Sequence, residues 1–509
     1  MATQTIETER KYDAPPGTVL PDLASLPEAA AESEPEEQTL RARYFDTDDL
    51  RLIRHGITLR RRTGGRDAGW HLKLPLGGHS RSEIRLPPGR PAAQVPAELA
   101  SLVRAFTRGQ PLRPVAQIST VRNRRLLLGT AGESLAEVVA DDVSAQAMGD
   151  AAALSRWHEV EVELTGGGAA LLAAADRRLR RSGLSPAARQ AKLERALADQ
   201  LAGADGEKRL APPTPRTPAA DVIMAYARAQ VGTLMSFDPL VRRDAPDAVH
   251  QMRVATRRLR SMLSSFGQVL RRGECRWLAR ELKWLGDVLG AARDAEVLDA
   301  HLTESLDQVP PELAIGPVAA RVRVHFAPVE AAARTAVLEA LDSERYLELL
   351  DGLDRLLADP PLTPDAGRSA AEVLPHAVRR TRRRLRRRMH RAANAPAGPD
   401  RDTALHEARK AAKHARYSAE AVSPAFGKPA RRFGQRVKKV QSALGDHHDR
   451  VVARAAIREI GMQAHLAGEN AFTFGVLYER DACRGDELED QARHAWHRAA
   501  QPRYRRWLR

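Results

Sequence analysis

The sequence predicts an α+β protein with an N-terminal antiparallel β-barrel followed by an all-α region. Three observations lead to this fold class. Residues 1–165 show the two-residue alternation of strands. Residues 203–218 are rich in Gly and Pro without any period, as in a linker. From residue 220 onward the pattern is helical and rich in Ala, Leu and Arg.

Composition limits the location and the partners of the protein. The 509 residues carry a formal net charge of +16, which favours polyanionic partners. Aromatic residues make up only 4%, which counts against proteins that stack RNA bases or single strands. Cys275 and Cys483 show no zinc-site spacing, so we expect free thiols in a reducing compartment. The first residues lack a secretory signal and no apolar run is long enough to span a membrane, so we expect a cytoplasmic protein.

The N-terminal region contains enough strands to close a barrel. Turn signals such as TGGRDAG separate the strands, and helices are expected at 96–107 and 168–201. Eight antiparallel strands enclose an interior that holds side chains or one small ligand. The predicted strands are 7–11, 39–47, 57–62, 70–75, 82–86, 116–128, 135–145 and 158–164.

Charged residues occupy alternate positions of these strands, so that each row of charges shares one face. A single row is explained by a solvated face, but the rows are sorted by strand into acidic and basic ones. A barrel interior that carries both would bind an anion through a metal: carboxylates hold Mg²⁺ or Mn²⁺, and arginine forks hold phosphate. The rows are Glu7, Glu9 and Lys11; Arg60 and Arg62; Arg122 and Arg124; Glu137 and Asp141; and Glu159, Glu161 and Glu163, with Lys73 on a further strand.

Six segments, in this order, resemble the CYTH family, the triphosphate tunnel metalloenzymes. They are ETERK (7–11), YFDT (44–47), LRRR (59–62), WHLKLP (70–75), the arginine strand 116–128 and EVEVEL (159–164), and the resemblance covers residues 1–202. It implies an eight-stranded antiparallel tunnel that hydrolyses or cyclises triphosphates with Mg²⁺ or Mn²⁺.

The resemblance also implies roles for individual side chains. Lys11 would polarise a phosphoryl oxygen or position the attacking water. Where the family has a Ser-Lys pair on a helix, this chain has Ala191-Lys192. Glu137 and Glu163 lie on the same strand faces as the implied metal ligands but could equally be structural ion-pair partners. The implied metal ligands are Glu7, Glu9, Glu159 and Glu161, with Asp141 and Glu83 as further acids; the implied triphosphate ligands are Arg60, Arg62, Lys73, Arg122, Arg124 and Lys192.

The helical region contains an internal duplication. Segment 249–266 matches 405–422, and each carries a histidine followed by basic residues at +3, +7 and +10, which is one stripe of an α-helix. The stripes are His250, Arg253, Arg257 and Arg260, and His406, Arg409, Lys413 and Arg416. A second helix follows each, with Lys283, Gly290 and Asp294 matching Lys438, Gly445 and Asp449. Breaks in the helical pattern are expected at 308–317, 359–367 and 394–400.

This arrangement resembles CHAD, the conserved histidine α-helical domain, over residues 220–509. The resemblance implies two pseudo-symmetric four-helix bundles, in repeats of about 220–358 and 368–509, and a basic surface that binds inorganic polyphosphate. The candidate polyphosphate ligands are the two stripes together with Lys283 and Lys438. Asp294 and Asp449 are expected to orient these basic side chains. The arginine run 379–389 is either a polyanion-binding rail or a solvated helix face.

Two further patterns carry less weight. A metal-ligand role for His250 and His406 ranks below phosphate binding, because no carboxylate follows at i+4. The His447-His448-Asp449 run, which is found in only one repeat, is treated as a coincidence.

Together these patterns predict a metal-dependent triphosphatase, with inorganic triphosphate as substrate, joined to a polyphosphate-binding domain. Association with polyphosphate granules in the cytoplasm would follow. The alternatives are a polyphosphate-binding protein without activity, a thiamine triphosphatase and a class IV adenylyl cyclase. Few aromatic residues in the first domain could stack a thiazolium or adenine ring. Nucleic-acid binding by the helical region lacks a fold motif, and no membrane partner is expected.

Overall fold

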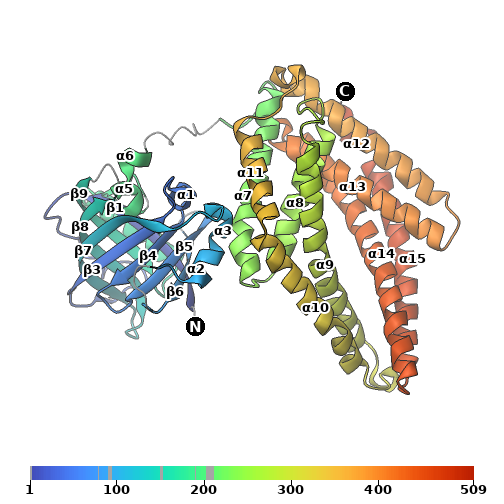
Figure 1. Cartoon of the computed structure of the whole chain (residues 1–509), viewed down its shortest axis with the longest axis horizontal. Coiled ribbons are helices and arrows are strands. Elements are labelled where there is room, and N and C mark those ends of the chain that lie inside the picture. The colour runs from blue at the N-terminus through green and yellow to red at the C-terminus, as the bar shows by residue number, and fades with distance from the viewer. Residues whose placement is uncertain are drawn as a thin grey trace. The chain divides into compact units, whose positions relative to one another are not determined.

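The computed structural model describes residues 3–77, 80–89, 94–148, 153–189, 191–201 and 211–508. Contacts divide the chain into two compact units, Met1–Lys208 and Arg209–Arg509 (Figure 1). The first contains the strands, and the described residues of the second form helices and no named strand. Of the predicted linker at 203–218, residues 203–210 lie outside the described part of the chain.

The first unit is a closed antiparallel barrel, as predicted. Its strands follow the order β1-β6-β5-β4-β3-β7-β8-β9, and β9 pairs back with β1. Every predicted strand is present. The barrel strands are β1 (Thr3–Ala14), β3 (Glu36–Asp46), β4 (Thr58–Thr63), β5 (Gly69–Gly77), β6 (Ser80–Leu86), β7 (Arg113–Leu128), β8 (Ser134–Ala147) and β9 (Leu154–Leu164), and two-residue strands β2 (Ala31–Glu32) and β10 (Ser185–Pro186) pair with β7 and β1.

The barrel strands turn their apolar residues outward, onto helices. Val160 and Val162 of β9 are buried in one cluster with Leu171 and Leu179 of helix α4 (Ala169–Arg181). Because side chains alternate along a strand, this outer core turns the intervening charged residues inward. Trp157 shares the inward face of β9 with Glu159 and packs in a separate cluster with Tyr44 and with residues of α5 (Lys192–Ala196) and α6 (Ala198–Leu201).

The predicted helices of this unit are shorter than expected. Helix 168–201 is divided into α4, α5 and α6, because Gly183 adopts φ +95° after the end of α4 and Pro186 follows in strand β10. Helix 96–107 is divided into α2 (Ala97–Leu102) and α3 (Arg104–Thr107). A further short helix, α1 (Arg51–Arg54), gave no sequence signal.

The second unit is helical throughout its described residues, and all three predicted breaks are present. Helices α8 and α9 correspond to α13 and α14 in the sequence repeat, and α8 contacts α13 across the two repeats. The helices are α7 (Ala219–Arg242), α8 (Ala248–Ser265), α9 (Arg276–Asp307), α10 (Val318–Asp342), α11 (Glu344–Ala358), α12 (Ala370–Ala393), α13 (Pro399–Phe426), α14 (Lys428–Leu466) and α15 (Phe472–Ala499).

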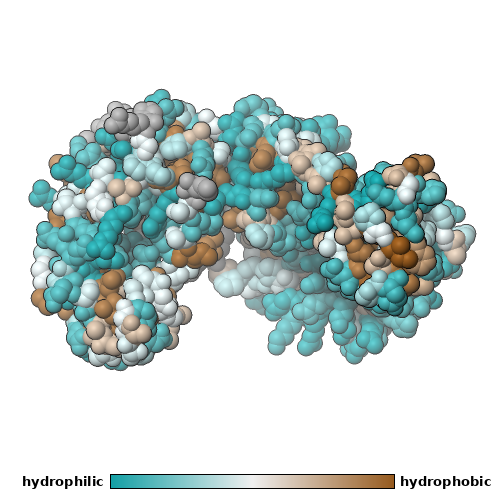
Figure 2. Space-filling model, turned by 90° about the horizontal axis from the view of Figure 1, so that it is seen from below, coloured by the Kyte–Doolittle hydropathy of each residue, from teal (hydrophilic) through white to brown (hydrophobic). Residues whose placement is uncertain are grey.

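The visible surface of the helical unit is largely hydrophilic, with one hydrophobic patch near the edge of the view in Figure 2. Exposed apolar side chains occur around the α14–α15 connection, among them Leu466 and Phe472. Within the described residues, no helix has the length and hydropathy needed to cross a bilayer.

Candidate functional site

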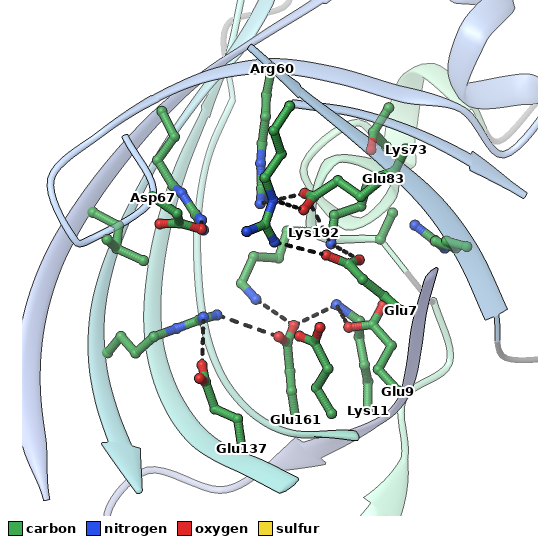
Figure 3. A pocket seen from close by; sticks show the side chains of 18 of the residues that line it. Glu7, Glu9, Lys11, Arg60, Asp67, Lys73, Glu83, Glu137, Glu161 and Lys192 are labelled. Carbon is green, nitrogen blue, oxygen red and sulfur yellow. Dashed lines mark hydrogen bonds and ion pairs between the residues drawn. The ribbon is translucent and has the colours of Figure 1, made fainter. Parts of the chain in front are cut away.

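The barrel encloses a cavity of about 320 Å³ whose wall is mostly charged (Figure 3). Eleven of the thirteen residues predicted for the triphosphate and its metal line it; the other two, Asp141 and Glu159, contact Lys192 just behind the lining. Glu137 and Glu163 line it as well. The eleven are Glu7, Glu9, Lys11, Arg60, Arg62, Lys73, Glu83, Arg122, Arg124, Glu161 and Lys192.

One wall carries a compact group of three buried carboxylates, Asp141 on β8 and Glu159 and Glu161 on β9. One oxygen of each lies within 4.8 Å of the others. Asp141 and Glu159 are direct cross-strand partners, which fixes their spacing. Three oxygen donors so close together suit a hard divalent cation such as Mg²⁺ or Mn²⁺. Trp157 Nε1 donates to Glu159 Oε2 at 2.6 Å and orients that carboxylate.

Ammonium groups lie against all three carboxylates of this group. Lys192 Nζ lies 2.6–2.9 Å from an oxygen of each of the three acids. Lys11 Nζ donates to Glu161 Oε1 at 2.5 Å. Burial opposes ionisation of Glu161, but Lys11 and Lys192 outweigh it and hold its pKa well below the usual range. The pKa of Asp141 is lowered in the same way, against burial, by Lys192 and Arg122.

A second acidic group, Glu7 and Glu83, lies on β1 and β6. Lys73 pairs with Glu7 and lies 3.7 Å from Glu83. Arg85 pairs with both carboxylates. Burial raises the pKa of Glu7, whereas Glu83, equally buried, keeps a lowered pKa because His71 and Lys73 stabilise its charge. The sequence placed Glu7 and Glu83 in one metal-ligand set with the β9 acids; the structure separates two groups.

Lys11 connects the first strand to the carboxylates of β9. Its Nζ lies 3.3 Å from Glu9 Oε2 in addition to its contact with Glu161. Burial lowers the pKa of Lys11, but Glu161 and Glu9 raise it by more, so the pKa lies above its ordinary value. Lys11 therefore acts as a cation and hydrogen-bond donor rather than as a base.

The arginines divide into an engaged pair and a pair with unmet donors. Arg122 binds Asp141 through two contacts of 2.8 Å, and Arg124 Nε donates to Glu137 at 2.7 Å. Arg60 reaches Tyr44 at 3.1 Å, and Arg62 pairs with Asp67. Yet the Nε–H groups of Arg60 and Arg62 are buried without a hydrogen-bond partner among the described residues. Unmet donors in a charged cavity fit an anionic ligand.

Burial and the neighbouring guanidinium groups of Arg60 and Arg122 lower the pKa of Arg62 to about 9. An anion bound beside these guanidinium groups would relieve their mutual repulsion.

Sequence reasoning missed several polar residues of this cavity, among them Tyr44, Asp67 and Arg85 in its lining and His71, which contacts Glu83. His71 shares the parity of Lys73, and Arg85 that of Glu83, so alternation could have identified both. His71 Nδ1 lies 2.9 Å from Glu83 Oε1 and its Nε2 lies 2.8 Å from the Asp67 carbonyl. Burial lowers the pKa of His71 to about 4, so it is neutral and fixes Glu83. Asp67 lies in a turn, where no periodic signal exists.

The helical unit contains a second charged cavity, of about 510 Å³. His250, Arg253 and Arg257 of α8 and the equivalent residues of α13 line it together, so both stripes of the repeat contribute to one pocket. Its donors are also incompletely used: the Nε–H groups of Arg253, Arg257 and Arg409 have no partner within the described chain. The α13 residues are His406, Arg409 and Lys413.

The repeated Gly and Asp support the arginines of this pocket from the second helix of each repeat. Arg253 lies 3.3 Å from Asp294, and Arg409 lies 3.7 Å from Asp449, as the sequence suggested. A Cβ at Gly290 would lie 3.3 Å from Arg253, so the glycine lets the guanidinium lie against the helix.

The structure does not bring every predicted polyphosphate ligand to this cavity. Arg260, Arg416, Lys283 and Lys438 are not among its lining residues. Arg416 reaches the edge through Gln441 at 3.2 Å, and Lys283 is exposed and pairs with Asp287 at 2.6 Å. Lys438 is exposed on α14.

His448 does line the pocket, with its Nδ1 3.2 Å from that of His406, whereas His447 lies 3.6 Å from Asp402.

Comparison with known proteins agrees with this architecture. Residues 5–191 match the family model of the CYTH domain, and residues 225–458 match that of the CHAD domain. The chain is 40% identical over 506 residues to the uncharacterized protein Rv2226 of Mycobacterium tuberculosis, covering 96% of this chain and 94% of that protein.

Two solved structures resemble part of the chain. PptA from Streptomyces chartreusis is 23% identical with a TM-score of 0.48, covering 55% of this chain and 100% of that one. The CHAD domain from the plant Ricinus communis is 26% identical with a TM-score of 0.45, covering 57% and 97%. From the two domain matches and the full-length relative, we conclude that this chain belongs to the family of proteins in which a CYTH domain is followed by a CHAD domain.

Proposed function

We propose that the barrel hydrolyses a linear triphosphate, with inorganic triphosphate as the substrate, in the presence of Mg²⁺ or Mn²⁺. The observation that carries this proposal is the enclosed cavity, whose lining includes Glu161, clustered with Asp141 and Glu159, and two arginines with N–H groups that have no partner among the described residues. Phosphoryl transfer depends on positioning and on neutralising oxygen charges, and this cavity supplies groups for both.

Each part of the wall has a role in this proposal. Asp141, Glu159 and Glu161 would hold the divalent cation, which when bound neutralises phosphate oxygens and lowers the pKa of water. Arg60, Arg62 and Lys73 bind the outer phosphate oxygens. Lys11, which stays protonated, donates a hydrogen bond to a phosphoryl oxygen and stabilises the charge that develops there. Glu7 and Glu83 hold Lys73 in place, and the remaining basic groups, Arg122, Arg124 and Lys192, neutralise the opposite side.

The lining favours an inorganic chain over a nucleotide or thiamine ester. Tyr44 is the single aromatic residue among the described lining residues, and its hydroxyl is engaged by Arg60. A base or thiazolium ring would therefore find a single ring in this lining on which it could stack.

The test is phosphate release from tripolyphosphate by the full chain with Mg²⁺ or Mn²⁺, alongside ATP, thiamine triphosphate and long-chain polyphosphate. We expect tripolyphosphate to be the best substrate, and Glu161→Gln to abolish its hydrolysis. No metal-dependent release from any of the four by the wild type would refute the proposal. A preference for ATP or thiamine triphosphate would replace the substrate assignment.

We further propose that the helical pocket binds inorganic polyphosphate. Six basic or imidazole side chains of the two stripes line one cavity, and three of them have N–H groups without a partner among the described residues. Regularly spaced phosphates offer oxygens to both repeats at once. The test is calorimetric titration with polyphosphate and with duplex DNA at equal phosphate concentration. We expect DNA not to displace polyphosphate; displacement would indicate a general polyanion surface instead.

A further inference from the structure

We propose that Lys192 is a built-in counter-ion of the barrel: its ammonium occupies the position of the divalent cation and leaves when that cation binds. The inference rests on the proposed metal-dependent function and adds to it. Lys192 then sets the affinity of the barrel for metal. Its ammonium binds phosphate only after the metal has displaced it from the carboxylates.

The first argument is the position of the ammonium. Lys192 Nζ lies 2.9 Å from Asp141, 2.6 Å from Glu159 and 2.6 Å from Glu161, and the side chain is 8% exposed. These are the three carboxylates that come together closely enough to share one cation. A divalent ion bound at their centre needs oxygens at about 2.0–2.6 Å and cannot share that space with an ammonium.

The second argument is that lysine fits this site imperfectly. Glu159 Oε1 is buried and accepts no hydrogen bond from any described residue, although the ammonium lies 2.6 Å away. Its other oxygen is held by Trp157. Glu159 Oε1 thus lies beside the ammonium charge of Lys192 but has no N–H group directed at it. A metal ion imposes no hydrogen-bond direction and would use this oxygen fully.

The third argument is that the ammonium has somewhere to go. Lys192 is the first residue of α5, and the preceding Ala191 is extended rather than helical. Its flexible side chain also lines the cavity that contains the unmet arginine donors. Once displaced, the ammonium would meet triphosphate oxygens there. Metal and triphosphate should therefore bind with positive cooperativity, because the first releases a ligand for the second.

Mn²⁺ titration calorimetry on the full chain tests the competition. We expect Lys192→Met to bind Mn²⁺ at least about tenfold more tightly than the wild type, and to melt at a lower temperature without metal. Arg180→Met removes a surface charge from the same unit, where Arg180 pairs with Asp176 at 3.0 Å, and should leave Mn²⁺ affinity unchanged. Equal or weaker Mn²⁺ binding by a folded Lys192→Met overturns the inference.

A second measurement needs no variant, so it remains informative if Lys192→Met does not fold. Lysine acetylation of the wild type, read by mass spectrometry, should increase at Lys192 when Mn²⁺ is added and stay constant at the exposed Lys410. Unchanged or reduced labelling of Lys192 overturns the inference. If neither the wild type nor Lys192→Met binds Mn²⁺, the metal-dependent function itself is wrong; if both bind equally, only the role of Lys192 is.

Discussion

At the scale of single residues, neighbouring positions on β1 have opposite surroundings. Lys11 contacts Glu9 and Glu161 inside the barrel, whereas Arg10 pairs outside with Asp176 of α4 at 2.7 Å. One strand therefore offers a functional cation and a matched control. The ETERK segment alone predicted that Glu7, Glu9 and Lys11 share one strand face, because side chains alternate. The prediction that this face points inward needed the charge rows of the other strands and the family resemblance.

Replacing Lys11 should remove transition-state stabilisation, and it also removes one of the two ammonium groups that lower the pKa of Glu161. We expect Lys11→Met to reduce tripolyphosphate turnover by about 10²–10³-fold, the usual cost of losing one donor to a developing charge. Arg10→Met should retain wild-type turnover. Equal losses in the two variants, measured by phosphate release, would place the effect in folding rather than in the cavity.

The lowered pKa of Lys413 predicts that the proposed polyphosphate binding depends on pH. Burial and the cations Arg409, Arg257 and Arg253 lower this pKa to about 7, against the opposing charge of Asp449. Below pH 7 Lys413 is protonated in the free pocket. Above pH 7 it loses this proton, and Lys413 must take up a proton again when an anion binds. Affinity should thus fall as pH rises from 7, by up to about tenfold per unit. His448, with a pKa of about 4, stays neutral in this range.

Titration calorimetry at pH 6, 7 and 8 measures this dependence. Lys413→Arg keeps its charge throughout and should flatten the profile, while Lys410→Met, on the exposed face of α13, should keep it. A wild-type affinity that does not change between pH 7 and 8 would show that Lys413 retains its proton in the free pocket.

At the scale of elements, sequence periodicity predicted strands better than short helices. All eight strands were correct because alternation extends over their whole length. The prediction of one helix over 168–201 was wrong between α4 and α5. The apolar pattern of the sequence continues across Gly183 and Pro186, but a helical backbone cannot continue there. That break places Lys192 at the start of a new helix beside the carboxylates, a position that periodicity alone could not predict.

Two helix glycines should respond in opposite ways to alanine. A Cβ at Gly352 of α11 would lie 2.5 Å from the Trp277 ring, so Gly352→Ala should lower the free energy of unfolding by about 1–3 kcal/mol. At Gly445 of α14 the nearest atom, Arg409 Nε, is 3.7 Å away. There alanine should stabilise by up to about 1 kcal/mol, because it favours the helix. Urea denaturation followed by circular dichroism would measure both; the same sign for the two variants would contradict the packing described.

At the scale of the whole molecule, each unit holds its own cavity lined by charged side chains, one formed by strands and one by helices. The sequence predicted that the two stripes form one shared basic surface, but not which residues of each stripe line the pocket, since that depends on how α8 and α13 pack. For the same reason it grouped Arg260 and Arg416 with residues that line the cavity, although these two do not.

Two separate cavities predict that the activities can be removed independently. Glu161→Gln should abolish tripolyphosphate hydrolysis and leave polyphosphate affinity unchanged. The double variant Arg257→Met and Lys413→Met should weaken polyphosphate binding by about tenfold or more and leave hydrolysis unchanged. Parallel phosphate-release and calorimetric assays would test this, and loss of both properties in either variant would show that the cavities depend on each other.

The pairing of β1 with β9 also has a consequence for biosynthesis. Since β9 begins at Leu154, the first strand leaves the ribosome long before its last partner exists. At 5–20 residues per second this interval is roughly 8–30 s. During that time an unsealed edge is available to other nascent chains, and the like charges of Glu7 and Glu9 would discourage such pairing. The same carboxylates that later face the cavity would then first protect the growing chain from aggregation.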